Sequence, residues 1–139
     1  MKSPHRLLSR SILLLLLAAP AFRAMAAGDS TQLERGRYLV ERAILCVDCH
    51  SPRNEKGEFV MEHWLKGAAL PFAPTVDMPW SPVAPPIAGL PSMTAEEGVR
   101  FLMEGTRPDG TRARPPMPEF RLNAEDARAV VAYLKSLQP

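Results

Sequence analysis

The stretch Cys46-Val47-Asp48-Cys49-His50 decides the fold of this chain. It contains both cysteines of the 139-residue sequence, separated by two residues and followed at once by a histidine. Two cysteines are too few for a disulfide-rich scaffold. They are also too few for a site in which four thiolates hold zinc or an iron–sulfur cluster.

Cys-x-x-Cys-His is the sequence that attaches a c-type haem. Two thiols add across the two vinyl groups on one edge of the haem, and two intervening residues give the sulfurs the right separation. The next histidine is placed under the iron, where a neutral imidazole coordinates. We therefore predict one covalent haem c, attached to Cys46 and Cys49, with His50 as an iron ligand. A zinc site lacks ligands, because His63 is the only other histidine after residue 27.

The alternative use of two cysteines at this spacing is a thiol–disulfide redox pair. Such a pair begins a helix that follows a strand in an α/β fold. Here the motif follows an expected helix at Gln32–Leu45, which has a broad apolar face and a capping box of Thr31 and Glu34. The haem interpretation is therefore favoured.

The N-terminal residues have the pattern of a secretory signal. A basic start precedes an apolar stretch at Ile12–Ala19, and small residues at 24–26 suit a signal peptidase. The apolar run is shorter than the roughly 20 residues that span a bilayer. We predict a signal peptide at 1–27, a mature domain at 28–139 and no transmembrane segment after cleavage. An uncleaved anchor is the alternative.

Removal of the signal changes the net charge. Residues 1–27 carry four of the 17 lysines and arginines and none of the 15 acidic residues, so the net charge of +2 becomes −2. A mildly acidic exported chain is not suited to polyanions, and we expect no nucleic acid partner. Export would place the chain in the periplasm, an oxidising compartment.

Residues 51–92 are expected to be irregular. Seven prolines fall within residues 71–91, and each removes a backbone donor and fixes φ. A disordered linker is one interpretation. Apolar residues between the prolines favour a rigid loop packed over something apolar: Phe72, Met78, Trp80, Val83, Ile87 and Leu90.

Two further helices are expected. Ala95–Glu104 follows a capping box of Thr94 and Glu97. Ala124–Leu137 follows Asn123 as N-cap, and its apolar residues recur at helical spacing. Since no strand pattern of any strength occurs, the predicted fold class is all-α with long loops.

Four segments, in this order, resemble class I c-type cytochromes: Gly36-Arg37-Tyr38-Leu39-Val40, residues 46–53, Pro-Pro-Met-Pro at 115–118, and Ala132-Tyr133-Leu134-Lys135-Ser136-Leu137. The chain is most similar to monohaem cytochromes related to the cytochrome subunits of membrane-bound dehydrogenases. The resemblance covers about residues 33–137 and is weak over 54–83. It implies the cytochrome c fold, with three to four helices around one covalently attached haem and a long proline-rich loop.

The resemblance implies roles for two residues outside the attachment motif. Gly36 would let the first helix approach the turn of the last helix that contains Tyr133, with the two helices crossing at near right angles. Pro85 begins a segment similar to the family loop whose first proline accepts the Nδ1–H of the haem histidine. Pro85 would therefore orient His50 and set its basicity.

The resemblance also places a methionine ligand just before the last helix, where Met117 lies. The flanking prolines make this loop stiff, so the thioether can be held at the iron with little entropy to lose. Met78 and His63 are the competing ligands. The other methionines are disfavoured by an unsupported polar stretch, a helix cap and a core-facing position, respectively: Met61, Met93 and Met103.

Several polar side chains near the haem have two interpretations each. Trp80 either donates its indole N–H to a haem propionate or is a plain core residue. Arg53 either pairs with a propionate or lies in solvent. Four arginines near the methionine loop form either a docking rim for an acidic redox partner or a solvated face: Arg107, Arg112, Arg114 and Arg121.

The predicted function is single-electron transfer in the periplasm by a haem with His/Met ligation. Enzymatic activity is not expected, because a six-coordinate iron has no open site for a substrate. The partners would be a dehydrogenase or a terminal oxidase. Two alternatives stay open: a fixed electron-accepting subunit of a larger membrane-bound dehydrogenase complex, and a five-coordinate haem sensor or enzyme in which Met117 is only a loop residue.

Overall fold

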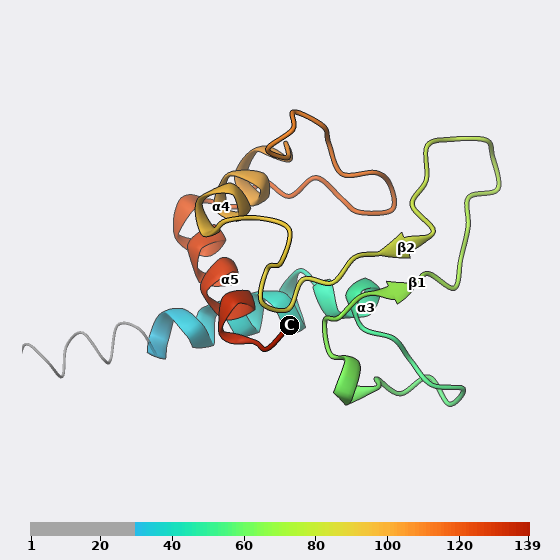
Figure 1. Ribbon diagram of the computed structural model, residues 1–139, viewed down its shortest axis with the longest axis horizontal. Helices are drawn as coiled ribbons and strands as arrows, with labels where there is room; N and C mark the ends of the chain where they lie inside the picture. The colour runs from blue at the N-terminus through green and yellow to red at the C-terminus, as the bar shows by residue number, and fades with distance from the viewer. Residues whose placement is uncertain (1–29) are drawn as a thin grey trace, which may run out of the picture. The chain divides into compact units, whose positions relative to one another are not determined.

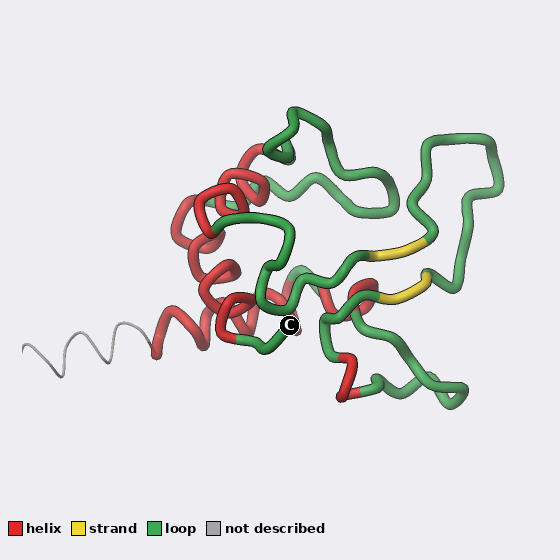
Figure 2. Tube along the Cα trace, viewed as in Figure 1, coloured by secondary structure: helices red, strands yellow, loops and turns green. Residues whose placement is uncertain are grey.

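The computed structural model describes residues 30–139, and the predicted signal peptide lies outside the described residues. Within the unit Gln32–Pro139, most of the helical residues gather at one end and the long loops at the other (Figure 2). In the described part of the chain, no helix has the length and apolar character needed to cross a bilayer.

The first helix covers residues 30–38 and continues into the π-helical turn η1 (Leu39–Ala43). A helix was expected here, but the predicted capping box of Thr31 and Glu34 is wrong, because residue 30 is already helical. Leu45 then adopts a left-handed conformation with φ of 54°. This residue interrupts the helix, and α3 (Cys46–His50) begins directly after it.

The helices α4 (Ala95–Glu104) and α5 (Ala124–Ser136) pack against each other. Both begin at the predicted caps. Thr94 and Glu97 form the reciprocal capping box, with N···O distances of 2.8 and 3.2 Å. The side chain of Asn123 accepts a hydrogen bond from the backbone N–H of Asp126 at 2.8 Å. These local bonds satisfy backbone donors that the first helical turn leaves unpaired.

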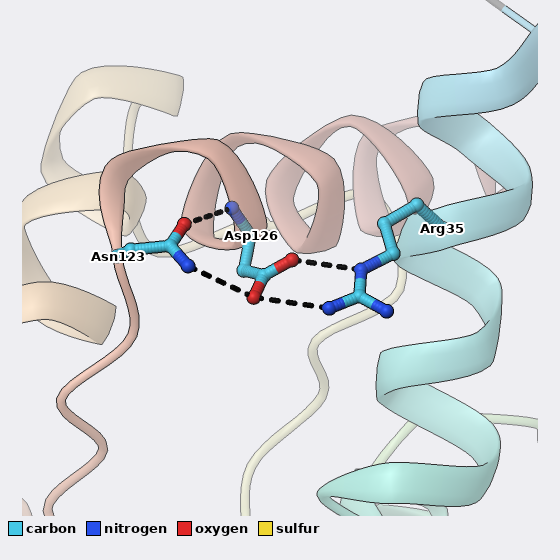
Figure 3. A network of polar contacts seen from close by, with 3 residues as sticks. All are labelled: Arg35, Asn123 and Asp126. Atoms are coloured by element: carbon cyan, nitrogen blue, oxygen red, sulfur yellow. Dashed lines mark hydrogen bonds and ion pairs between the residues drawn. The ribbon is translucent and has the colours of Figure 1, made fainter.

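The first helix crosses α5 at one close contact (Figure 1). A Cβ atom on Gly36 would lie 2.6 Å from the carbonyl carbon of Ala129 and 2.8 Å from Cβ of Tyr133. Only glycine allows this approach. Beside it, Arg35 donates to both carboxylate oxygens of Asp126, at 2.8 and 3.1 Å (Figure 3). The expected packing of the first and last helices is confirmed.

The proline-rich region contains one short ladder, in which β1 (Ala68–Ala69) pairs antiparallel with β2 (Val83–Ala84). Two residues per strand are too few to leave an alternating sequence pattern. A 3-10 turn, η2 (Met61–His63), precedes the ladder. Ser81 N donates to Pro115 O at 2.8 Å and joins the end of this region to the methionine loop.

The tip of the proline-rich loop differs from the expectation of a packed segment. Phe72, Val76 and Met78 are 50%, 67% and 40% exposed. Burial resumes at Trp80, which is half-buried, and at Leu90, which belongs to the core. The loop is therefore anchored through its base, while its apolar tip faces solvent.

Candidate haem site

A cavity of about 520 Å³ lies between α3, α4, α5 and the loops that join them. This volume is in the range of roughly 300–1,000 Å³ that is usual for ligand and cofactor sites. The walls are mostly apolar and include the following side chains: Leu70, Ile87, Leu102, Phe120, Val130 and Leu134. Both cysteines and His50 also line it. The cavity thus suits a large apolar group attached at α3.

Helix α3 presents the attachment motif to this cavity. Because Leu45 breaks the preceding helix, Cys46 begins a new one instead of continuing the old register. Cys46 and Cys49 are three residues apart in this helix and so lie on one face. His50 is the last residue of α3 and is buried.

The pKa values of both cysteine thiols are raised above the ordinary range. Burial raises the pKa of Cys46 to about 12, and burial together with the Asp48 carboxylate raises the pKa of Cys49. A reactive redox cysteine has the opposite shift, towards a lower pKa. The raised pKa values of the two thiols therefore give no support to the thiol–disulfide alternative.

The imidazole of His50 is held in one tautomer. Its Nδ1 lies 2.7 Å from the backbone oxygen of Pro85. A carbonyl oxygen only accepts, so Nδ1 carries the proton and Nε2 carries the lone pair. Burial lowers the pKa of His50, against the opposing effect of this hydrogen bond. A neutral imidazole with a free Nε2 is the form that coordinates a metal.

The cytochrome c family model matches residues 33–138. The chain belongs to the cytochrome c family. A diheme cytochrome c-type protein of Cereibacter sphaeroides is 31% identical over 134 residues, which cover 87% of this chain and 40% of that relative. This chain therefore spans less than half the length of the relative. The predicted cytochrome c fold is confirmed, and the single attachment motif is consistent with one covalent haem c.

Two methionines of this cytochrome c line the cavity, Met117 and Met93. Met93 packs against the hydrophobic core, whereas Met117 stands in the proline-clamped loop. The Met117 backbone N–H donates to Arg114 O at 3.1 Å and closes the turn that carries it. The competing ligands Met78 and His63 are exposed and do not line the cavity. The sequence did not predict that Met93 lines the cavity, because this residue directly precedes the N-cap Thr94 and its backbone was expected to be committed there.

Trp80 lies beside the cavity lining, not in it. Its ring packs edge-on against Phe72, with centroids 5.7 Å apart. Its Nε1 is buried and has no hydrogen-bond partner among residues 30–139. A buried donor without an acceptor costs about 1–3 kcal/mol. An acceptor from outside the polypeptide, such as a haem carboxylate, would remove this cost.

Arg53 also lies outside the cavity lining. Its guanidinium donates to Asp48 Oδ1 at 3.0 Å and to Gly57 O at 2.8 Å, and it lies over the ring of Phe59 at 3.7 Å. These contacts give Arg53 partners of its own within the attachment loop. Its exposure agrees with the solvent position that was the alternative to propionate pairing.

Sequence reasoning did not separate the four arginines near Met117, and the structure does. Arg107 and Arg114 line the cavity. Arg112 instead pairs with Glu119 at 2.5 Å, and Arg121 is exposed away from the cavity. No periodic pattern could have sorted these residues, because the segment that carries them is irregular.

Proposed function

We propose that this chain is a periplasmic single-electron carrier with one haem c, whose iron is held by His50 and Met117. The observation that carries the proposal is that one cavity is lined by both cysteines of the motif, by His50 and by Met117. Members of the family are usually electron carriers rather than enzymes. Haem bound in this cavity supplies an iron that gains or loses one electron.

The residues of the site have separate tasks in this proposal. Cys46 and Cys49 would hold the cofactor covalently. Pro85 fixes the ring of His50, so that its Nε2 lone pair would be free to hold the iron. The soft thioether of Met117 would favour the reduced iron and raise the potential. The apolar walls would exclude water, and an iron held by both His50 and Met117 would have no open position for a substrate.

Export is part of the proposal and is supported by the sequence of residues 1–27. The mature domain would then be residues 28–139, acting in the periplasm with a dehydrogenase or a terminal oxidase as redox partner. Recovery of the chain in the periplasmic fraction, with an N-terminus near residue 27, is the expected result. A chain that stays in the membrane with residue 1 intact would contradict cleavage.

Spectra of two matched methionine variants test the ligand assignment. Met117→Ala should lower the reduction potential, open the reduced iron to carbon monoxide and abolish the weak sulfur-to-iron band of the oxidised protein. Met78→Ala, at an exposed thioether, should change none of these. Retention of the band in Met117→Ala would contradict the assignment, and Met93→Ala would then identify the other thioether at the cavity. Carbon monoxide binding by the unmodified protein would favour the five-coordinate alternative.

A second candidate is a fixed electron-accepting subunit of a larger dehydrogenase complex. One observation favours it: the chain matches 40% of a relative that is named a diheme protein, so a segment similar to this chain occurs there as part of a longer protein. Gel filtration of a native extract separates the candidates. A free carrier elutes at the size of the single chain, and a subunit elutes with a large flavin- or quinone-containing enzyme.

A further inference from the structure

Two arginines at the cavity form no ion pair in the part of the chain that the structure describes. Arg107 and Arg114 line the cavity, and neither forms an ion pair within 4.0 Å among residues 30–139. Other arginines of the same segment behave as ordinary surface residues, since Arg112 pairs with Glu119 and Arg121 is exposed outside the lining. The half-buried Arg107 and the exposed Arg114 are therefore the two arginines of this segment that bring positive charge to the cavity.

The backbone holds the Arg107 side chain in place. Residues 106–112 form a tight turn in which Arg107 N donates to Thr111 O at 2.7 Å. The guanidinium donates from Nη1 to Arg112 O at 2.6 Å and lies 5.8 Å from the ring centroid of Phe101, which lines the cavity. A half-buried guanidinium fixed in this way loses little entropy when it binds an anion, and its remaining N–H groups stay available.

The charges of the lining do not balance. Asp48 is the only carboxylate that lines the cavity among the described residues, and Arg53 already pairs with it at 3.0 Å. Neither Arg107 nor Arg114 therefore has a carboxylate partner within 4.0 Å among the described residues, and for the half-buried Arg107 such a partner would be favourable.

A further donor lies close in the chain to this pair of arginines. Ser81 N donates to Pro115 O at 2.8 Å, and these two bonded residues directly follow Trp80 and Arg114 in the sequence. The buried Nε1 of Trp80 lacks an acceptor. The two joined segments thus carry a cation and an unsatisfied N–H, both of which an acceptor with negative charge would satisfy.

We infer that Arg107 and Arg114 bind the two carboxylates of the haem and thereby raise its reduction potential. The inference rests on the proposed function, because it takes haem as the group in the cavity. Guanidinium groups pair with carboxylates through two parallel hydrogen bonds, and two such groups match two carboxylates in charge. Positive charge near the haem would disfavour the oxidised form, which carries one more positive charge than the reduced form.

The test compares reduction potentials of the full haem-loaded chain, measured by spectroscopic redox titration. Arg107→Gln and Arg114→Gln should each lower the potential by more than Arg121→Gln, which removes the same charge outside the cavity. At about 1 M salt, where the Debye length is roughly 3 Å, the shift of Arg121→Gln should vanish and the other two should persist. Arg107→Lys, which keeps the charge, should recover part of the lost potential.

Equal shifts in all three glutamine variants, or shifts that disappear in salt, would overturn the inference and assign both arginines to the surface. If Arg107→Gln does not mature, Arg114→Gln decides the test, because the Arg114 side chain makes no hydrogen bond to any of residues 30–139 that could hold the loop together. Haem content distinguishes a failure of the proposed function from a failure of the role of the arginines. A wild-type chain without covalent haem would refute the proposed function, whereas haem-loaded variants of unchanged potential would refute only the role of the arginines.

Discussion

Two regions of the molecule differ in the contacts that stabilise them. The helical frame consists of residues 30–43, α4 and α5. The loop wall consists of residues 51–92 and 105–122. The frame is fixed by its own contacts, including two capped helix starts and the close approach at Gly36. The loop wall has one ladder of two residues per strand, and its apolar side chains Ile87 and Leu90 face the cavity. Contacts within the polypeptide are enough to stabilise the frame, whereas we expect the wall to need the group in the cavity for its stability.

Removal of the haem should therefore have the largest effect. In a Cys46→Ser, Cys49→Ser double variant, the apolar walls of a cavity of about 520 Å³ would face water. A chain of this size has a small core to offset that exposure. We expect the variant to be largely unfolded, with little far-UV circular dichroism and no cooperative melt. Ile87, Leu90 and Leu102 line the cavity and would pack against the haem, whereas Phe72 is half exposed and does not line it.

The single variant Cys46→Ser is the control for this experiment. One remaining thioether should retain haem more weakly, and the helical spectrum should stay close to that of the wild type. A native-like helical spectrum with a cooperative melt in the double variant would show that the loop wall is stable by itself. The distinction between frame and wall would then be lost.

Two glycines in helices allow a test of the frame. Gly36→Ala forces a Cβ against the backbone of Ala129, which cannot move without separating the helices. Gly98→Ala in α4 meets only side-chain atoms, Leu90 Cδ2 at 2.8 Å and Val131 Cγ2 at 3.1 Å. Overpacking costs about 1–3 kcal/mol, and alanine regains about 1 kcal/mol of helix propensity at either site.

Denaturant unfolding of the haem-loaded variants measures the difference. Gly36→Ala should lower the free energy of unfolding by about 3 kcal/mol or more, near the upper end of that range. Gly98→Ala should stay within about 1 kcal/mol of the wild type, because the neighbouring side chains can rearrange. Equal losses at the two positions would mean that the helix crossing does not limit the stability of the frame.

The same division explains which features could be predicted from the sequence. The starts of α4 and α5 follow from caps within three residues of each helix, and the motif of α3 is contiguous. The hydrogen bond between His50 and Pro85 spans 35 residues and was anticipated only through the family resemblance. Local rules had no means of placing it.

Apart from the capping box wrongly predicted at Thr31 and Glu34, the features that were not predicted lie in the loop wall. The exposed tip at Phe72 and Met78, the contacts of Arg53 and the cavity position of Arg107 all depend on irregular backbone. Such segments have no repeat from which a buried face can be inferred. Proline density correctly indicated the absence of long helices, but it did not indicate which side chains face inward.

A smaller effect is expected at the helix caps. Asn123→Ala removes the acceptor of the Asp126 backbone N–H and should cost about 1 kcal/mol of unfolding free energy. Met78→Ala, at the exposed loop tip, should cost less than about 0.5 kcal/mol. Thermal melts of both variants measure the contrast. A larger loss for Met78→Ala would show that the tip is packed in solution.

The smallest effect concerns the pH dependence of the crossing between η1 and α5. The hydroxyl of Tyr133 donates to Glu41 Oε1 at 2.5 Å. Burial, followed by the hydrogen bond to the Glu41 carboxylate, raises the pKa of Tyr133 from 10 to about 12. The folded chain therefore keeps this proton at a pH where the unfolded chain loses it, so the stabilisation is complete below pH 10 and is lost as the pH rises to about 12. Because the pair is partly exposed and screened by water, we expect a loss of only about 0.5 kcal/mol. Denaturant melts between pH 9 and 12 should show this decline in the wild type and a flatter curve in Tyr133→Phe.

Tyr38→Phe, at the exposed tyrosine of the first helix, should follow the wild-type curve. If Tyr133→Phe and the wild type decline in parallel, the hydroxyl contributes nothing specific at the crossing, and the frame is held there by Gly36 and by the ion pair of Arg35 with Asp126 alone.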